Sequence, residues 1–450
     1  MTRCRKPKNM SKKQQGITAI TVQGYKSLYD ECRLEIRPLT ILAGANSSGK
    51  SSAMQPLLLL KQTIEASYDP GPLLLDGPNV RFTSASQLLS RLPSRSRPAS
   101  FRITLGLTGD RSLRLSYTSQ LKRGFVIGEM TYSDGKEAVT LRPGMGHDDI
   151  MSLLPDELRY LYDNIAKSEK RKPKWSVGRT RCFLELWLEA AAAQKGGPGL
   201  TKLAGFSPCG GFEAQIREVI HVPGLRGNPE RTYKTTAVGS VFPGTFETYV
   251  ASVVSHWQLA KGPLIGKLRE HLETLGLTWK VEARPIDETQ VELRVGRLLH
   301  GVRGGARDLV SIADVGFGVS QALPVVVSLL AATPGELVYL EQPELHLHPR
   351  AQTALVELLA DAARRGAKVV AETHSPLLLL GVQSLVAEGF PAELVKLYWF
   401  QRGKDGRTKV TGADLDSAGG FGDWPQDFGD VELKAESRYL DAAERVRGGK

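Results

Sequence analysis

The chain is poor in cysteine and has no long hydrophobic run. Its four cysteines among 450 residues lie far apart without a C-x-x-C pair, which argues against a zinc site or a disulfide framework. The longest nearly apolar run, 322–332, is well short of the ~20 residues that span a bilayer. The segment 1–16 is not followed by the apolar stretch of a secretory signal. We therefore expect a cytoplasmic protein without a membrane segment.

Acidic residues are outnumbered by basic ones, and the net charge is +11. This excess favours polyanionic partners, although a surface that is basic for no specific purpose is an equal alternative. Two segments concentrate the charge. Residues 1–16 carry six Lys or Arg and are expected to form a disordered basic tail, and residues 167–181 carry seven against one Glu.

The hydrophobic pattern predicts an α/β protein with a mixed or parallel sheet. In the N-terminal half, 17–145, β-branched residues alternate with polar ones over 17–43, and short strands over 70–145 predict a β-rich layer. A helical basic insertion is expected over 146–215, with helices at 151–169 and 181–195. The last part, 216–450, is expected to be the C-terminal half of the same domain. Residues 277–296 predict two antiparallel strands, and from 320 onward helices and strands alternate as a parallel sheet covered on both faces requires.

The stretch GANSSGKSS follows an apolar strand and precedes a predicted helix, 51–66, which Pro56 should kink or restart. In this context G-x-x-x-x-G-K-[ST] predicts a phosphate-binding loop, or P-loop. Glycines let the backbone approach phosphates, the helix N-terminus supplies positive dipole, Lys50 neutralises terminal phosphates and Ser51 ligates Mg²⁺. The predicted ATP-binding residues are Gly44, Asn46, Ser47, Ser48, Gly49, Lys50, Ser51 and Ser52.

Acidic residues follow a later apolar strand, as a P-loop protein requires for holding its metal and positioning water. Glu341 and Glu344 lie at the end of LVYLEQPELHLHP, and we predict that Glu341 shares the Mg²⁺ with Ser51. His374 follows the next strand, VVAET, and is suited to sensing the terminal phosphate. A single strand-end histidine is nevertheless more often structural.

Four ordered stretches, GANSSGKSS, DVGFGVSQALPVV, YLEQPELHLHPRAQ and ETHSP, resemble the ABC-type AAA ATPases of the overcoming-lysogenization, RecF and SMC-like group. HVPGLRGNPERTY and WPQDF resemble the branch found in bacterial anti-phage modules, including Septu-type ATPases. The resemblance implies an ABC-type P-loop ATPase head that forms a homodimer or larger oligomer around ATP. It also implies a signature segment offered in trans by Gly316, Gly318 and Ser320, a switch role for His374, and Lys26 near the nucleotide.

Gln342 departs from the ABC pattern, because a catalytic Glu usually follows the metal-side acid. An amide cannot accept the proton of the attacking water, so we expect slow hydrolysis unless Glu344 or the metal-bound geometry substitutes. The predicted catalytic residues are Glu341, Gln342, Glu344 and His374. His346 and His348 alternate as metal ligands in a strand could, but the resemblance places them at a dimer interface.

The resemblance also implies a partner effector. Only 76 residues follow His374 (450 minus 374), without the pattern of a Toprim nuclease domain, so an HNH-type nuclease subunit is the expected partner. The basic insertion is either a solvated loop or a contact for DNA or an acidic partner, and an exposed Trp favours contact. Its candidate residues are Lys170, Arg171, Lys172, Lys174 and Trp175. A RecF-like or SMC-like ATPase that binds DNA directly is the main alternative, and a transporter subunit is disfavoured by the long insertion.

Overall fold

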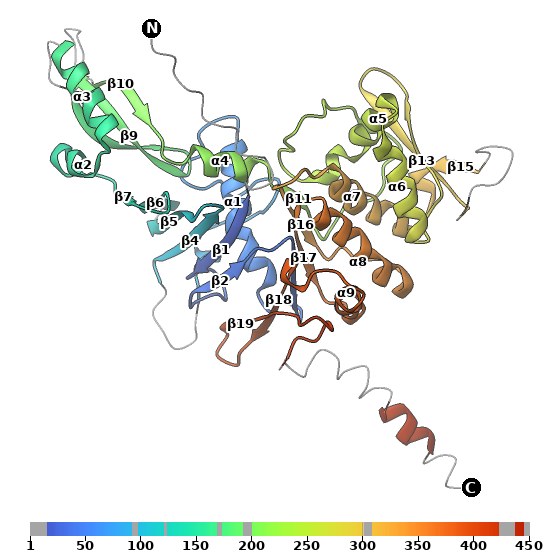
Figure 1. Ribbon diagram of the computed structural model, residues 1–450. Coiled ribbons are helices and arrows are strands. Elements are labelled where there is room, and N and C mark those ends of the chain that lie inside the picture. The colour runs from blue at the N-terminus through green and yellow to red at the C-terminus, as the bar shows by residue number, and fades with distance from the viewer. Residues whose placement is uncertain are drawn as a thin grey trace.

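The computed structural model describes residues 16–91, 98–120, 124–168, 173–191, 200–298, 300, 308–422 and 437–444. Its centre is a six-stranded sheet in the order β11-β16-β17-β3-β18-β19 (Figure 1). The strands are β11 (Ile220–Val222), β16 (Leu337–Glu341), β17 (Lys368–Thr373), β3 (Leu39–Gly44), β18 (Val395–Arg402) and β19 (Thr408–Ala413). Only β18 and β19 pair antiparallel, which confirms the predicted α/β fold with a mixed sheet.

Both faces of the central sheet are covered. Every residue of β3 is buried, and its alternate side chains belong to two different cores, Ile41 to one and Leu42 to the other. The first core contains helices α7 (Phe317–Ala331), α8 (Pro349–Arg364) and α9 (Pro376–Ala387). The second contains α1 (Lys50–Glu65) and the N-terminal strands. This burial on both sides explains the continuous apolar strand sequences.

The N-terminal layer is a second sheet in the order β2-β1-β4-β5-β6-β7, antiparallel throughout. Its strands are β1 (Ile17–Gln23), β2 (Cys32–Glu35), β4 (Ser100–Leu107), β5 (Arg111–Gln120), β6 (Gly124–Ser133) and β7 (Ala138–Leu141). Buried and solvent-facing residues alternate in β4, as expected when one face packs on a core. The β-rich layer predicted from the sequence is thereby confirmed.

The insertion forms an arm that extends from the body (Figure 1). Two helices, α2 (His147–Leu153) and α3 (Asp156–Ser168), accompany a three-stranded sheet of β8 (Lys174–Thr180), β9 (Phe183–Ala191) and β10 (Leu200–Phe206). The expected helix over 181–195 is therefore wrong. Leu and Ala favour helices, but Leu184, Leu186, Leu188 and Ala190 are buried at a period of two, so strand pairing overrides that preference.

Trp175 was expected to be exposed for partner contact, and this prediction is also wrong. Its side chain is 2% exposed and its ring makes an edge contact with Phe206, with ring centroids 5.7 Å apart. Lys174 beside it is exposed. The other predicted contact residues, Lys170, Arg171 and Lys172, lie outside the described residues, as does the basic tail up to residue 15.

The remaining elements form a lobe beside the first core. A sheet of β12 (Tyr233–Lys234), β14 (Gln290–Gly296), β13 (Val281–Pro285) and β15 (Leu309–Ser311) packs with α5 (Val250–Ala260) and α6 (Pro263–Thr274). A short helix, α4 (Gly210–Arg217), precedes β11. Within the described residues, no helix combines the length and apolar character that crossing a bilayer requires.

Helix α1 continues through Pro56 instead of restarting there. Proline removes one backbone donor from a helix interior. Burial compensates here, because almost all of α1 is enclosed, with Met54, Leu57 and Leu58 at 0% exposure. The P-loop helix is therefore a single element that packs between the central sheet and the N-terminal layer.

Candidate functional site

The P-loop connects β3 to α1, and its two outer glycines allow the tight turn. Gly44 has φ 148° and Gly49 has φ 105°, backbone conformations that favour glycine. A Cβ on Gly44 would lie 2.3 Å from the carbonyl oxygen of Phe400, and one on Gly49 would lie 2.6 Å from Thr408 Oγ1. The loop therefore fits tightly against β18 and β19 only with glycine at both positions.

Lys50 starts α1 and lies under the loop with only 4% exposure. Its Nζ donates hydrogen bonds to the carbonyl oxygens of Gly44 and Ala45, each at 3.0 Å, and lies 3.2 Å from His374 Nε2. Burial lowers the pKa of Lys50, although the charges of Glu372 and Glu344 oppose this shift. Burial and the Lys50 charge lower the pKa of His374. A ring nitrogen of neutral His374 can therefore accept a hydrogen bond from the Lys50 ammonium group.

Ser51, the predicted metal ligand, contacts an acid that the sequence analysis missed. Ser51 Oγ donates to Glu372 Oε2 at 2.8 Å, and the Tyr339 hydroxyl donates to Glu372 Oε1. Glu372 is 2% exposed. Burial and the nearby charge of Glu341 raise the pKa of Glu372 to about 7. Its position two residues before His374, at a strand end, was the available signal.

Glu341 lies one strand further from the P-loop. Its Oε1 is 3.2 Å from His221 Nε2, and its Oε2 accepts from the Gly224 backbone N–H at 3.1 Å. Burial acts to raise the pKa of Glu341, but the hydrogen bonds from His221 and from the Gly224 backbone oppose burial, and this pKa is lowered. The structure thus pairs Ser51 directly with Glu372, and the shared metal site of Ser51 and Glu341 stays a prediction.

Gln342 and Glu344 take different positions after β16. Gln342 lines the cleft beside the P-loop and has a left-handed backbone, with φ 46°. Glu344 is 7% exposed, and its Oε1 accepts from Thr373 Oγ1 at 2.7 Å and from the His374 backbone N–H at 3.1 Å. Glu344 therefore holds the β17 end and the backbone of His374 in place.

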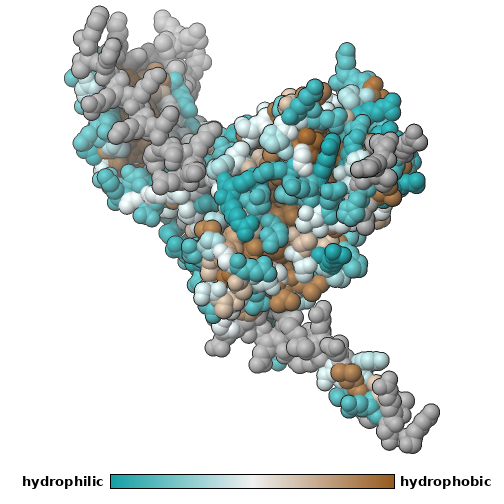
Figure 2. Space-filling view, turned by 45° about the vertical axis from the view of Figure 1, so that its right-hand side comes forward, coloured by the Kyte–Doolittle hydropathy of each residue, from teal (hydrophilic) through white to brown (hydrophobic). Residues whose placement is uncertain are grey.

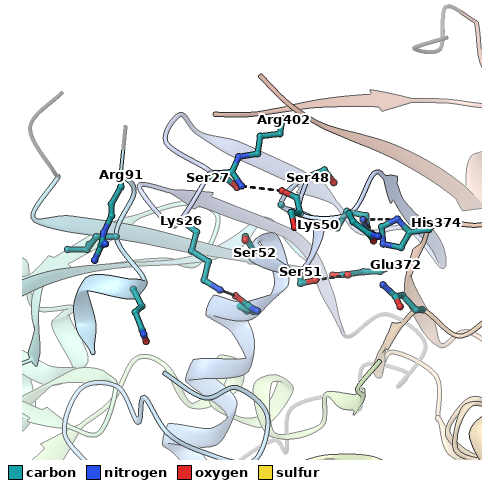
Figure 3. Close-up of a pocket in the computed structure, with 17 residues that line it drawn as sticks. Lys26, Ser27, Ser48, Lys50, Ser51, Ser52, Arg91, Glu372, His374 and Arg402 are labelled. Carbon is teal, nitrogen blue, oxygen red and sulfur yellow. Dashed lines mark hydrogen bonds between the residues drawn. The ribbon is translucent and has the colours of Figure 1, made fainter. Parts of the chain in front are cut away.

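The P-loop, Gln342, Glu372 and His374 line a cleft of about 600 Å³ (Figure 3). Among the described residues, its lining contains four Lys or Arg side chains and one carboxylate, that of Glu372, so its charge favours a polyanion. The cations are Lys26, Lys50, Arg91 and Arg402. Arg402 and Arg91 were not predicted, because they lie 352 residues (402 minus 50) and 41 residues (91 minus 50) beyond Lys50 in chain order.

Most predicted nucleotide-binding residues meet in this cleft. The lining includes Asn46, Ser47, Ser48, Gly49, Lys50, Ser51 and Ser52, together with Gln342 and His374. Lys26 faces them from the N-terminal layer, and its Nζ donates to Gln55 Oε1 at 2.6 Å. Burial lowers the pKa of Lys26 to about 8. Lys26 thus lines the P-loop cleft, and its approach to the nucleotide, implied by the resemblance, stays a prediction.

The predicted signature segment lies elsewhere, at the start of α7. Gly316 precedes the helix and is exposed, while Ser320 is 9% exposed and its Oγ donates to the Phe317 carbonyl oxygen. The Phe317 ring is 52% exposed and stacks on His346, with ring centroids 5.7 Å apart. Gly316, Gly318 and Ser320 do not line their own chain's P-loop cleft among the described residues.

Arg226, from the stretch HVPGLRGNPERTY, joins this helix to the acidic strand end. Its guanidinium donates to the carbonyl oxygens of Gln321, Glu341 and Gln342 at 2.9, 3.0 and 3.1 Å. Gln321 returns hydrogen bonds to the carbonyl oxygens of Arg226 and Gly227. Burial lowers the pKa of Arg226 to about 10, so it remains charged at neutral pH.

The donor set fits phosphate with Mg²⁺. The Ser48 hydroxyl is buried beside the loop and has no hydrogen-bond partner among the described residues, which leaves it available to a phosphate oxygen. Ser51 and Glu372 supply the hard oxygen ligands that Mg²⁺ prefers, usually one or two carboxylates plus substrate phosphates and water. No group of three or more His, Cys, Asp or Glu side chains in the described part of the chain could hold a metal alone.

Comparison with known proteins supports a P-loop ATPase. Residues 240–380, less than half of the chain, match the family model described as "AAA domain, putative AbiEii toxin, Type IV TA system". This range contains α7, Gln342 and His374 but not the P-loop. The comparison with curated proteins found no match. The family match and the P-loop together support an ABC/AAA-type P-loop ATPase, and neither is specific to the Septu type.

Similar solved structures are SMC head domains. An Smc head domain with a coiled coil and joint derived from Pyrococcus yayanosii has a TM-score of 0.47 and 8% identity, covering 90% of this chain and 98% of that chain. An SmcHead bound to the C-winged helix domain of ScpA has a TM-score of 0.46 and 10% identity, covering 90% and 99%. A Pyrococcus furiosus Smc head domain, bound to the C-terminal domain of ScpA, has a TM-score of 0.42 and 11% identity, covering 96% and 100%.

Proposed function

We propose that this chain binds ATP with Mg²⁺ and hydrolyses it slowly, as an ABC-type P-loop ATPase. The observation that supports this most directly is the cleft in which the P-loop, His374 and four cationic side chains converge around a single carboxylate. A triphosphate carries the charge that such a lining favours. The backbone N–H groups at the start of α1 and the helix dipole add to this preference.

Each residue has a proposed task in binding. Lys50 exchanges its contacts with the Gly44 and Ala45 carbonyl oxygens for terminal phosphate oxygens. Arg402 and Lys26 approach the phosphates from opposite walls of the cleft. Ser51 and the predicted acid Glu341, with Glu372 between them, are the residues that would hold Mg²⁺. When bound, Mg²⁺ neutralises charge on the phosphate oxygens and stabilises the charge of the transferring group.

Slow hydrolysis follows from Gln342. Its side chain lines the cleft where a general base is expected, and an amide can orient a water molecule but cannot accept its proton. Glu344 is buried behind His374 and already accepts two hydrogen bonds, so its proposed role is to position His374. Nucleotide occupancy is then long-lived, which suits a switch better than a motor.

A second copy of the chain is the proposed partner across the nucleotide. The exposed Gly316 and Phe317 at the start of α7 are available to such a copy, and Ser320 lies one turn further along the helix. Helix N-termini bind anions readily, so this segment is suited to meet the terminal phosphate from the opposite side. The resulting homodimer or larger oligomer would report nucleotide state through its assembly.

The proposed output is control of an effector, an HNH-type nuclease subunit, in bacterial anti-phage defence. The sequence resemblance to Septu-type ATPases and the matched family, whose description names a toxin–antitoxin system, support this proposal. Direct DNA binding in the manner of RecF or SMC ATPases is the alternative. Co-purification with genomic neighbours separates the two, since an effector that is released or activated by ATP favours the first, and ATP-dependent DNA binding by the chain alone favours the second.

Nucleotide binding is tested by titrating the full chain with a fluorescent ATP analogue and Mg²⁺. We expect Lys50→Ala to weaken binding by roughly a hundredfold, because a charge-assisted hydrogen bond contributes about 1.5–3 kcal/mol and Lys50 makes more than one. Lys61→Ala is not a suitable control, since Lys61 is buried in an ion pair with Glu65. Lys174→Ala, an exposed change on the arm, should bind normally. Wild-type affinity in Lys50→Ala would refute the site.

A further inference from the structure

Two carboxylates lie on neighbouring strands behind the P-loop, and the register of the central sheet orders them. Glu372 is 2% exposed, whereas a quarter of the Glu341 side chain is exposed. Glu341 of β16 pairs with Glu372 of β17, and Glu372 pairs with Leu42 of β3. Neighbouring strands are about 4.8 Å apart, so Glu341 starts roughly 10 Å from the strand that leads into the P-loop. Glu372 starts at half that distance.

The two carboxylates also differ in their contacts. Glu372 receives its hydrogen bonds from Ser51, on the P-loop helix, and from the Tyr339 hydroxyl. Glu341 is held by His221 and by the Gly224 backbone N–H, both on the side away from the P-loop. Glu372 lines the cleft, whereas Glu341 does not line it among the described residues.

The groups around Glu341 form a support that reaches Glu372. The Asn79 amide nitrogen lies 3.1 Å from His221 Nδ1. Because an amide N–H can only donate, His221 Nδ1 accepts this hydrogen bond, and the N–H at Nε2 donates a hydrogen bond to Glu341. The His221 ring stacks on Tyr339 with centroids 5.3 Å apart and an interplanar angle of 11°. This stack fixes the Tyr339 ring, whose hydroxyl then orients Glu372.

We infer that Glu372 is the carboxylate that holds the metal together with Ser51, and that Glu341 is a positioning residue behind it. The inference rests on the proposed binding of ATP with Mg²⁺ and changes the assignment of its acid from the β16 end to the β17 end. Ser51 Oγ and Glu372 Oε2 already face each other at 2.8 Å, so both oxygens are directed toward the same point of the cleft. A divalent cation there would also offset the repulsion that the charge of Glu341 exerts on the buried carboxylate of Glu372.

The test measures the affinity of the full chain for Mn²⁺ by electron paramagnetic resonance, in the presence of a non-hydrolysable ATP analogue. Loss of a ligand or its orienting partner typically costs about 10–100-fold in metal affinity. We expect Glu372→Gln to weaken Mn²⁺ binding at least tenfold, toward the upper part of that range. Glu341→Gln and Tyr339→Phe, which remove only the supporting groups, should weaken Mn²⁺ binding less.

A second measurement separates the metal from the nucleotide. With EDTA present, Glu372→Gln should bind the fluorescent ATP analogue as the wild type does, which also shows that the variant is folded. If Glu372→Gln does not fold, Glu372→Asp keeps the charge, withdraws the carboxylate and should show the same selective loss.

Two results would overturn the inference: wild-type Mn²⁺ affinity in Glu372→Gln, or a larger loss in Glu341→Gln than in Glu372→Gln. Either would leave the proposed function standing with Glu341 as the metal-side acid. Failure of the wild type to bind nucleotide with and without metal would instead refute the proposed function itself.

Discussion

Single side chains at two strand ends decide the chemistry of the cleft. After β16 an amide, Gln342, lines the cleft at the position where the resemblance implies a catalytic carboxylate, and after β17 a histidine, His374, lies 3.2 Å from the P-loop lysine. The acid that contacts Ser51 comes from β17 as well. The cleft therefore combines a P-loop with cationic side chains that favour a polyanion, and the slow hydrolysis proposed for it stays a prediction.

Gln342→Glu is predicted to raise ATP turnover by about a hundredfold, since general-base catalysis contributes typically 10²–10⁴-fold. The backbone at this position is left-handed, with φ 46°, and its cost is similar for Gln and Glu. The substitution therefore replaces only the amide by a carboxylate. Steady-state phosphate release measures the effect, with Gln342→Ala as the matched control that adds no carboxylate. Turnover that stays constant or falls would direct attention to Glu344 as the working base.

Lys26 is predicted to make nucleotide affinity depend on pH. Burial lowers the pKa of Lys26 to about 8. Its amino group is therefore positively charged below this pH and loses the charge as the pH rises through it. ATP affinity should therefore fall between pH 7.5 and 9, by about tenfold if one charge-assisted hydrogen bond is lost. Lys26→Arg should remove this decline, because arginine keeps its charge. If the ATP affinity of Lys26→Arg falls by the same factor, the pH dependence comes from a group other than Lys26.

Among the elements, those with strong periodicity were predicted best. The P-loop between β3 and α1, the alternation of α7, β16, α8 and β17, and the antiparallel pair β13 and β14 agree with the sequence patterns. Residues 181–195 were misread because Leu, Glu and Ala favour helices while their alternation fits a strand. Glu372 was missed because its partner, Ser51, is 321 residues away, and such pairing is visible only once strand order is known.

Trp175→Ala is predicted to destabilise the arm by about 3–5 kcal/mol, as expected for removing a fully buried aromatic side chain. The ring packs in the second core against Phe206, and the Trp175 backbone N–H donates to His147 Nδ1 at 3.0 Å. Hydrogen exchange of β8, β9 and β10 measures the loss. The neighbouring Lys174→Ala should leave exchange unchanged. Normal protection in Trp175→Ala would mean that the arm does not depend on this ring.

On the scale of the whole molecule, the described part of the chain has three regions. The central sheet carries the cleft, the arm extends to one side, and the lobe of α5, α6 and β13 lies on the other (Figure 1). The space-filling view shows mixed polar and apolar patches over the body (Figure 2). The start of α7 belongs to the lobe side, so a copy that met it would leave the arm available to a different partner.

Gly316→Glu is predicted to prevent ATP-dependent association without affecting ATP binding. A Cβ at Gly316 would meet no atom within 4 Å, and its φ of −63° is open to any residue, so the variant should fold normally. The added carboxylate would repel a phosphate presented by a second copy. Mass measurement with and without ATP is the assay, and Gly316→Ala is the control. If Gly316→Glu associates in the presence of ATP at the same protein concentration as the wild type, the start of α7 is not the association surface.

Arg226 has a mechanical consequence. Its guanidinium donates hydrogen bonds to the carbonyl oxygens of Gln321, Glu341 and Gln342. This one side chain therefore connects α7 to the end of β16 beside the cleft. Any tilt of α7 must pull on the backbone of Gln342 or break buried charge-assisted hydrogen bonds. If a second copy docks at the start of α7, we expect Arg226 to couple that contact to the backbone of Gln342 in the cleft.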